Sequence, residues 1–336
     1  HERAALVARE SRVLAEQTES PRAWEGWYQE ARALEALGDR PASAAAYSEA
    51  ATLLTSVLDD VQLDAVEMRS WLLDVKGVFD AAAAAQMAVA SGPGDLEAAL
   101  DLVEQGRSRV LLSAVLGGSE LTAPLDDPPA DERFEGLPGP TRRGLGRLGR
   151  LRGLRDRPWF KTSHLGGTHE RSTADLSEAA ADRRGRVAGA ATLGVSALRA
   201  RLPRSMGAVV FRSAVAGTDV FWVERDRIEA HSLPLGEQEL RALVDRYVSL
   251  MAASVTDPEA RPPFERASDA LRAATLGPVE ERIRGVRHLV VVPDGELYRV
   301  PFGALRRDGR YLVEQVSVSV APSMNILDAL LDRTPD

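Results

Sequence analysis

The chain has 336 residues, of which 44% are hydrophobic and 27% charged, a composition typical of soluble globular proteins. This length is enough for about two domains. Cysteine is absent, which excludes disulfides, thiolate metal sites and a cysteine nucleophile in this chain. The formal net charge of −8 disfavours nucleic-acid binding by bulk charge, and no apolar run approaches the roughly 20 residues that span a bilayer. These features predict a cytoplasmic protein without membrane contact.

Residues 1–118 have the composition of helices, because they are rich in alanine, leucine, glutamate and arginine, which are strong helix formers. Trp24, Trp27, Ala31 and Leu34 recur at spacings of three and four residues, which places them on one helix face. No strand-like alternation of apolar and polar residues interrupts this pattern. We therefore predict an all-helical segment.

Residues 119–200 have the composition of a linker, with prolines that break helices and many glycines. Within it, residues 141–157 contain seven arginines and one aspartate. Unpaired blocks of like charge usually remain solvated, so this arginine-rich stretch is interpreted as a tether. Contact with nucleic-acid phosphates is the weaker alternative. We predict a poorly ordered connection over 119–186 and a helix over 187–201.

Residues 201–336 alternate between strand-like and helix-like patterns, which predicts an α/β domain. The apolar run 288–292 indicates a strand buried on both faces, and the alternation over 316–320 indicates a half-buried strand. Gly217-Thr218-Asp219 and Asp308-Gly309 suit hairpin turns, and Ser323 suits a helix N-cap. The predicted strands are 208–211, 220–223, 228–233, 288–292 and 316–320, and the predicted helices are 236–254, 264–284 and a last one from about 324.

The first segment resembles a tetratricopeptide array, whose unit is a helix–turn–helix of 34 residues. Glu30 and Ser43 depart from this pattern, since leucine and alanine are usual at their positions. A plain helical bundle is the alternative. The resemblance implies that Trp27, Leu34 and Tyr47 are core residues. The positions that match the repeat are Trp27, Ala31, Leu34, Gly38, Tyr47 and Ala50.

The segment Glu104–Leu112 is similar to the helix that closes the repeat array in bacterial CHAT proteins, where CHAT denotes a caspase-like, separase-like domain. Residues 288–297, 300–305, 311–314 and 321–323 follow the order and spacing of the start of that domain. The resemblance covers about 1–118 and 200–331. It implies a tetratricopeptide-like α-solenoid in residues 1–118, a linker in 119–200 and the first part of a caspase-like α/β domain in 201–336.

The chemistry implied by the resemblance is that of a cysteine peptidase, in which a histidine deprotonates the attacking cysteine. In the family both residues lie downstream of the Ala-Pro-Ser segment, here 321–323, and this chain runs only to Asp336. We therefore interpret the chain as a fragment of a bacterial protein, truncated before the catalytic residues. Alone it is expected to bind a protein or peptide partner through its helical repeats, without peptidase activity. The alternative is a self-contained, non-enzymatic adaptor.

The remaining motifs do not support another site. The glycine pattern over 144–149 lacks the preceding strand that a dinucleotide site needs, and His164 and His169 are interpreted as solvated loop residues. His231 and His288 sit in strand patterns, and Pro293-Asp294-Gly295 is explained by turn chemistry. We therefore assign no catalytic, cofactor-binding or metal-binding residue and expect no cofactor and no small-molecule ligand. A nucleotide- or metal-dependent enzyme is the least favoured function.

Overall fold

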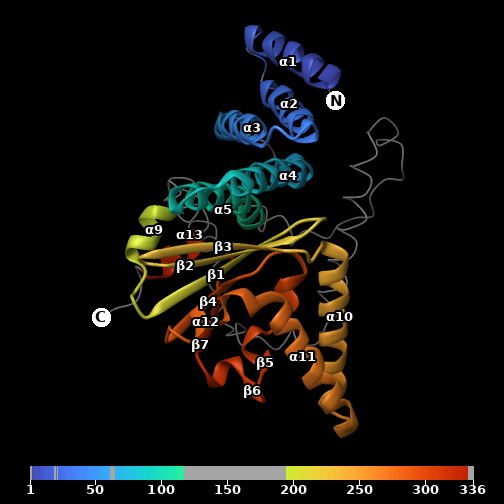
Figure 1. Cartoon of the computed structure of the whole chain (residues 1–336), viewed down its shortest axis with the longest axis vertical. Coiled ribbons are helices and arrows are strands. Elements are labelled where there is room, and N and C mark those ends of the chain that lie inside the picture. The colour runs from blue at the N-terminus through green and yellow to red at the C-terminus, as the bar shows by residue number, and fades with distance from the viewer. Residues whose placement is uncertain (1, 19, 21, 61–64, 117–193, 332–336) are drawn as a thin grey trace, which may run out of the picture. The chain divides into compact units, whose positions relative to one another are not determined.

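The computed structural model of the chain describes residues 2–18, 20, 22–60, 65–116 and 194–331 (Figure 1). The described part is mostly helical, with a mixed sheet toward the C-terminus, which confirms the predicted combination of an α and an α/β part. The residues described within 1–60, 77–108 and 192–336 belong to one compact unit. None of the described helices has the length and apolar character needed to cross a bilayer.

The described residues of the first part of the chain form helices joined by short turns, as the composition predicts. The helices are α1 (Glu2–Gln17), α2 (Ala23–Leu37), α3 (Arg40–Asp60), α4 (Ala65–Val89) and α5 (Pro93–Leu116). Consecutive helices α1 and α2, and α2 and α3, pack against each other.

The pair α2–α3 has a small apolar core closed by polar contacts. Ala31 and Tyr47 are buried between the two helices, and the Tyr47 hydroxyl donates to Glu35 Oε2 at 2.9 Å. The prediction that Tyr47 is a core residue is confirmed. Ser43, where the repeat pattern has alanine, donates its hydroxyl to the Ala31 carbonyl at 3.0 Å. Leu34 is only half-buried, so its place in the core is not borne out.

Trp27 also lies outside the core, contrary to the prediction. Its indole Nε1 donates to Glu16 Oε1 at 2.9 Å, and the guanidinium of Arg12 lies 4.0 Å from the centre of its ring. Glu30, at a position where leucine is usual, accepts from Arg12 Nε at 2.7 Å. Polar and charged side chains therefore make much of the contact between α1 and α2. Trp27 takes part through its indole N–H and through the face of its ring.

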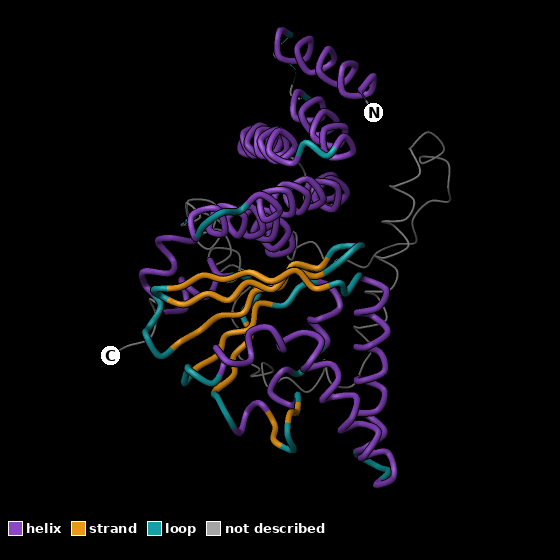
Figure 2. The backbone as a smooth tube through the Cα atoms, viewed as in Figure 1, coloured by secondary structure: helices purple, strands orange, loops and turns teal. Residues whose placement is uncertain are grey.

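The C-terminal part is built on a five-stranded sheet of order β3-β2-β1-β4-β7 (Figure 2). β1 pairs with β2 in antiparallel and with β4 in parallel register, and β4 pairs with β7 in parallel register. The carboxyl ends of β1, β4 and β7 therefore meet at one edge of the sheet. The strands are β1 (Met206–Ser213), β2 (Thr218–Glu224), β3 (Arg227–Leu233), β4 (His288–Val292) and β7 (Ser317–Val320).

All five strands lie where the residue patterns place them, with two corrections. Thr218 and Asp219 belong to β2 and are buried, so the hairpin loop is 214–217 instead of 217–219. β7 is mostly exposed instead of half-buried, because it is the last strand of the described sheet.

Each face of the sheet is covered by helices (Figure 1). Phe211 and Trp222 point to one face, where they share a core with α10 (Glu237–Ser254) and α11 (Arg261–Leu276). Val210 and Phe221 point to the other face, where they share a core with α4, α5, α9 (Val195–Arg201) and α13 (Met324–Leu331). The helix α5 thus contributes side chains to the hydrophobic core on this face of the sheet. As predicted for an apolar run, β4 is buried on both faces.

The predicted helix 264–284 is interrupted. α11 begins earlier, at Arg261, since Pro262 and Pro263 fit the first helical turn, where a missing N–H costs nothing. It ends at Leu276, and a short 3-10 turn, η3 (Gly277–Val279), precedes α12 (Glu280–Ile283) because Pro278 cannot continue the ladder of hydrogen bonds.

Short elements complete the C-terminal part. The strands β5 (Arg306–Arg307) and β6 (Arg310–Tyr311) form the predicted Asp-Gly hairpin, in which Asp308 and Gly309 both adopt positive φ angles, of 52° and 78°. The other short elements are the 3-10 turns η2 (Pro258–Ala260), η4 (Gly295–Arg299), η5 (Phe302–Ala304) and η6 (Leu312–Glu314).

The predicted linker 119–186 lies outside the described residues, and so does the start of the helix predicted for 187–201. The described remainder of that helix is α9.

Candidate functional site

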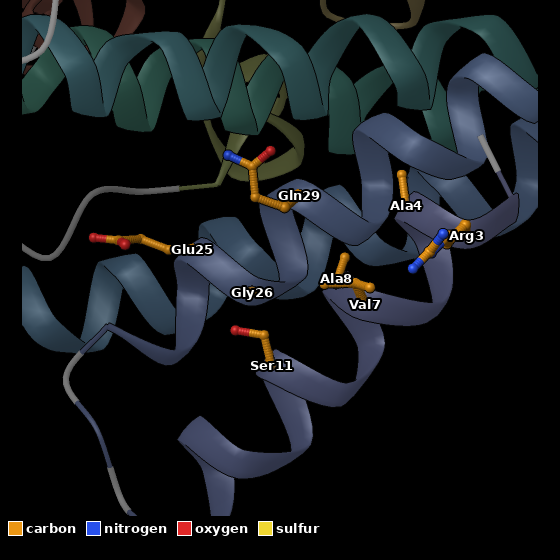
Figure 3. Close-up of a pocket in the computed structure, with 8 residues that line it drawn as sticks. All are labelled: Arg3, Ala4, Val7, Ala8, Ser11, Glu25, Gly26 and Gln29. Carbon is orange, nitrogen blue, oxygen red and sulfur yellow. The ribbon is translucent and has the colours of Figure 1, made fainter.

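An open groove of about 580 Å³ runs between α1 and α2 (Figure 3). Ala4, Val7 and Ala8 of α1 and Gly26 of α2 give it an apolar floor. Its rim is polar and carries charges of both signs. Concave, mostly apolar surfaces with a few polar groups at the rim are the usual form of ligand and peptide sites. The rim residues are Arg3, Ser11, Glu25 and Gln29.

Exposed apolar side chains continue along α1 from the groove. Leu6, Val7 and Leu14 are 58%, 57% and 62% exposed, and Val13 is also exposed. Exposed apolar side chains that gather on one element mark surfaces where partners bind. The groove and these exposed side chains together form a candidate interaction surface, which we call the α1 surface.

A second group of polar residues lies at the carboxyl edge of the sheet. Asp294 lies just after the end of β4. Its Oδ2 accepts from the Ser213 N–H, at the end of β1, at 2.9 Å. Asp294 therefore ties two neighbouring parallel strands together, which agrees with the structural role predicted from turn chemistry. Ligand sites of α/β folds lie at this edge of the sheet.

One side of α5 carries a row of charged residues that contact the sheet and its covering helices. Glu97 pairs with Arg199 of α9, and Asp101 Oδ1 accepts from the Val195 N–H at the start of α9, at 2.7 Å. Spacings of three and four residues place these groups on one helix face. The row, which we call the α5 stripe, consists of Glu97, Asp101, Glu104 and Arg107.

Glu104 and Arg107 form a buried ion pair, with Arg107 Nη1 and Glu104 Oε1 3.2 Å apart. Glu104 Oε2 also accepts from the N–H of Met324 at 2.9 Å, at the start of α13. Arg107 Nη2 donates to the carbonyl oxygen of Phe211, near the end of β1, at 2.6 Å. The two side chains therefore connect α5 to α13 and to β1.

The environment of Glu104 has opposing effects on its ionisation. Burial raises the pKa of the Glu104 carboxyl, while Arg107 and the N–H groups of Met324 and Asn325 act to lower it. A carboxyl whose pKa is raised by folding contributes stability that is lost as the pH rises through that raised pKa. The ion pair and the two N–H bonds offset only part of the effect of burial, since the pKa of Glu104 remains raised.

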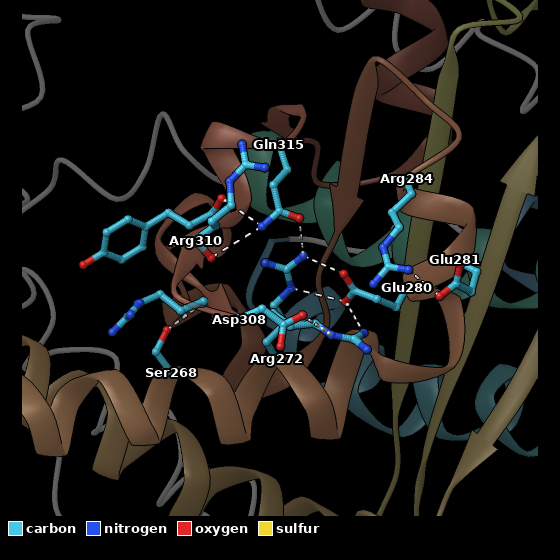
Figure 4. Close-up of polar contacts among 11 residues, drawn as sticks. Ser268, Arg272, Glu280, Glu281, Arg284, Asp308, Arg310 and Gln315 are labelled. Carbon is cyan, nitrogen blue, oxygen red and sulfur yellow. Dashed lines mark hydrogen bonds and ion pairs between the residues drawn. The ribbon is translucent and has the colours of Figure 1, made fainter.

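A second buried ion pair lies among α11, α12 and η6 (Figure 4). Arg272, fully buried on α11, donates from Nη2 to Glu280 Oε1 at 2.6 Å and to Gln315 Oε1 at 3.1 Å. Gln315 in turn donates to the carbonyls of Arg310 and Tyr311. This pair fastens the β5–β6 region to the helices, which is a structural role.

The two histidines that the structure describes, His231 and His288, lie in no catalytic arrangement. His288 begins β4 and its Nε2 lies 3.0 Å from Ser319 Oγ of β7, whereas His231 lies within β3 opposite Val220. Both positions match the predicted strand positions. The glycine pattern 144–149, the arginine stretch 141–157, His164 and His169 lie outside the described residues. In the described part of the chain, no group of three or more acidic or histidine residues could hold a metal ion.

Glu104 and Arg107 were not predicted as functional residues, although both lie in the segment that resembles the closing helix. Their signal in the sequence is a Glu–Arg pair three residues apart on a helix otherwise rich in apolar residues. Such a pair is usually a surface ion pair, so only its contacts with residues 211 and 324 reveal its role.

Residues 265–335 match the family model of the CHAT domain. The match starts within α11, includes β4, β7 and α13, and supports a CHAT domain protein, as the residues quoted from 288–323 predict. The CHAT domain suggests a caspase-like family member. No curated protein matches the sequence. The tetratricopeptide repeats and the position of the chain within a longer protein stay predictions.

Proposed function

We propose that this chain is a partner-binding module of a CHAT-domain protein, in which tetratricopeptide-like helices bind a peptide segment of a protein partner. The observation that carries the proposal is the α1 surface, which combines an open groove with more than half-exposed Leu6, Val7 and Leu14. An amphipathic peptide matches it, because apolar anchors fit the floor and polar residues remain at the rim.

The CHAT match supports placing this module next to peptidase-type chemistry in the same family. The chain itself contains no cysteine and so supplies no thiolate nucleophile. We therefore propose that its contribution is recognition of a partner and scaffolding.

The purified chain is expected not to cleave peptides. The measurement is incubation with a fluorogenic peptide library, beside a mock purification from the same host. Cleavage by the chain above the mock preparation would contradict the proposed role.

Peptides that bind the chain are expected to need the α1 surface. We suggest selecting peptides from a random displayed library on the full chain, then measuring their affinity for the variant Val7→Glu. A carboxylate in the apolar floor should weaken binding by about ten-fold or more, since burying an unpaired charge is costly. Fluorescence anisotropy of the labelled peptides measures the change.

The matched control is Val255→Glu, since Val255 is exposed and lies at the end of α10, outside the groove. This variant should bind the selected peptides as the unchanged chain does. If no selected peptide distinguishes Val7→Glu from Val255→Glu, the α1 surface is not the binding site and the proposal fails.

A further inference from the structure

The α5 stripe makes contacts that a helix of a separate repeat domain does not need. Two of its acidic residues bind N–H groups at the starts of other helices: Asp101 at α9 and Glu104 at α13. Negative charge at a helix N-terminus is stabilising, because unpaired N–H groups and the positive end of the helix dipole lie there. The N–H at the start of α13 thus has its hydrogen-bond acceptor on Glu104, which lies 220 positions earlier in the chain.

The same stripe contacts the sheet at its carboxyl edge. Arg107 donates to Phe211 O, and the next residue of β1, Arg212, donates to the carbonyl of Asp80 on α4 at 3.0 Å while pairing with Asp219 of β2. Two consecutive residues near the end of β1 are therefore held by α4 and α5. A shift of α5 cannot leave these buried bonds intact unless β1 and α13 move with it.

The packing of α5 against α4 leaves little room for such a shift. A Cβ atom at Gly106 would lie 2.9 Å from Phe79 Cβ of α4, so the two helices approach closely at this glycine. Tightly packed interfaces change between discrete arrangements and do not deform continuously.

We propose that Glu104 and Arg107 form a latch through which the position of α5 sets the order of α13 and of the end of β1. The latch links the helical part of the chain to the edge of the sheet where α/β folds place their ligand sites. It depends on contacts within the chain and holds whether or not a partner binds the α1 surface.

The test displaces α5 at its close contact with α4 and follows α13. Gly106→Ala pushes α5 away from Phe79, and hydrogen exchange with mass spectrometry on the full chain reports residues 327–331. These amides do not bond to Glu104, so their exchange reports transmission along α13. With the latch intact, we expect Gly106→Ala to accelerate their exchange by about ten-fold.

The same substitution is then made in a chain whose latch is cut. Glu104→Met with Arg107→Met removes both charges together and also removes the oxygen that accepts from the Met324 N–H, and it leaves neither charge buried and unpaired. In this background Gly106→Ala should change the exchange of 327–331 by no more than about two-fold, since the two effects are coupled and not additive. If this double variant does not fold, Glu104→Gln alone should give a response between these two values.

The matched control is the buried pair Arg272–Glu280, changed as Arg272→Met with Glu280→Met. It lies against the opposite face of the sheet, so the ten-fold response of α13 to Gly106→Ala should persist there. The latch is contradicted if Gly106→Ala leaves α13 unchanged in the unmodified chain. It is equally contradicted if the response is the same with the latch cut, since the substitution then acts by general destabilisation.

Discussion

Arg272→Ala should lower the free energy of unfolding of the chain by about 3 kcal/mol, because it removes the buried partner of Glu280 and leaves this carboxylate only the half-exposed Arg307, 3.4 Å away. Glu280 is 3% exposed, and its Oε1 and Oε2 both accept from the Arg272 guanidinium. Gln315 Oε1 would lose its donor, Arg272 Nη2, at the same time. Urea denaturation of the full chain, followed by circular dichroism, measures the change.

A neighbouring surface pair is the matched control (Figure 4). Arg284 donates to Glu281 at 2.6 Å, but these side chains are 50% and 78% exposed. Arg284→Ala should therefore cost less than about 1 kcal/mol. Arg272→Met combined with Glu280→Gln should cost less than Arg272→Ala, since no unpaired charge remains. Equal losses for Arg272→Ala and Arg284→Ala would show that the buried pair is not a major source of stability.

The strands could be predicted from the sequence because their signals are local. The apolar run 288–292 requires cover on both faces, and the Asp-Gly pair at 308–309 requires a turn with positive φ angles, wherever the rest of the chain lies. The interruption after Leu276 was missed because Gly277 and Pro278 stand in an otherwise continuous helical pattern.

The contacts of the helices could not be predicted in the same way. Trp27 matches a core position of the repeat pattern, yet its indole N–H binds Glu16 and its ring lies against Arg12. Periodicity places a residue on a face but does not say which helix that face meets. For the same reason, the Glu104–Arg107 pair gives no local sign that its partners are residues 324 and 211.

Residues 201–336, produced alone, should self-associate and bind a hydrophobic dye. Without α4, α5 and α9, one face of the sheet loses the helices that share its core. The burial of a large apolar side chain is worth about 1.5–3 kcal/mol, so several such losses reach the order of 10 kcal/mol. That is comparable to the whole stability of a domain, about 5–15 kcal/mol. The sheet residues concerned are Ala208, Val210, Phe221, Val223, Val290 and Val292.

Size-exclusion chromatography and dye fluorescence measure the effect, and a second chain supplies the control. Residues 65–118, which contain α4 and α5, should restore a dye-silent complex when produced together with residues 194–336, which also contain α9. The same pair with Leu100→Asp should not, because Leu100 is fully buried in the shared core. If residues 201–336 alone prove monomeric, dye-silent and cooperatively folded, their sheet does not depend on α5. The α/β part is then self-contained, and the latch between α5 and α13 joins two independent domains.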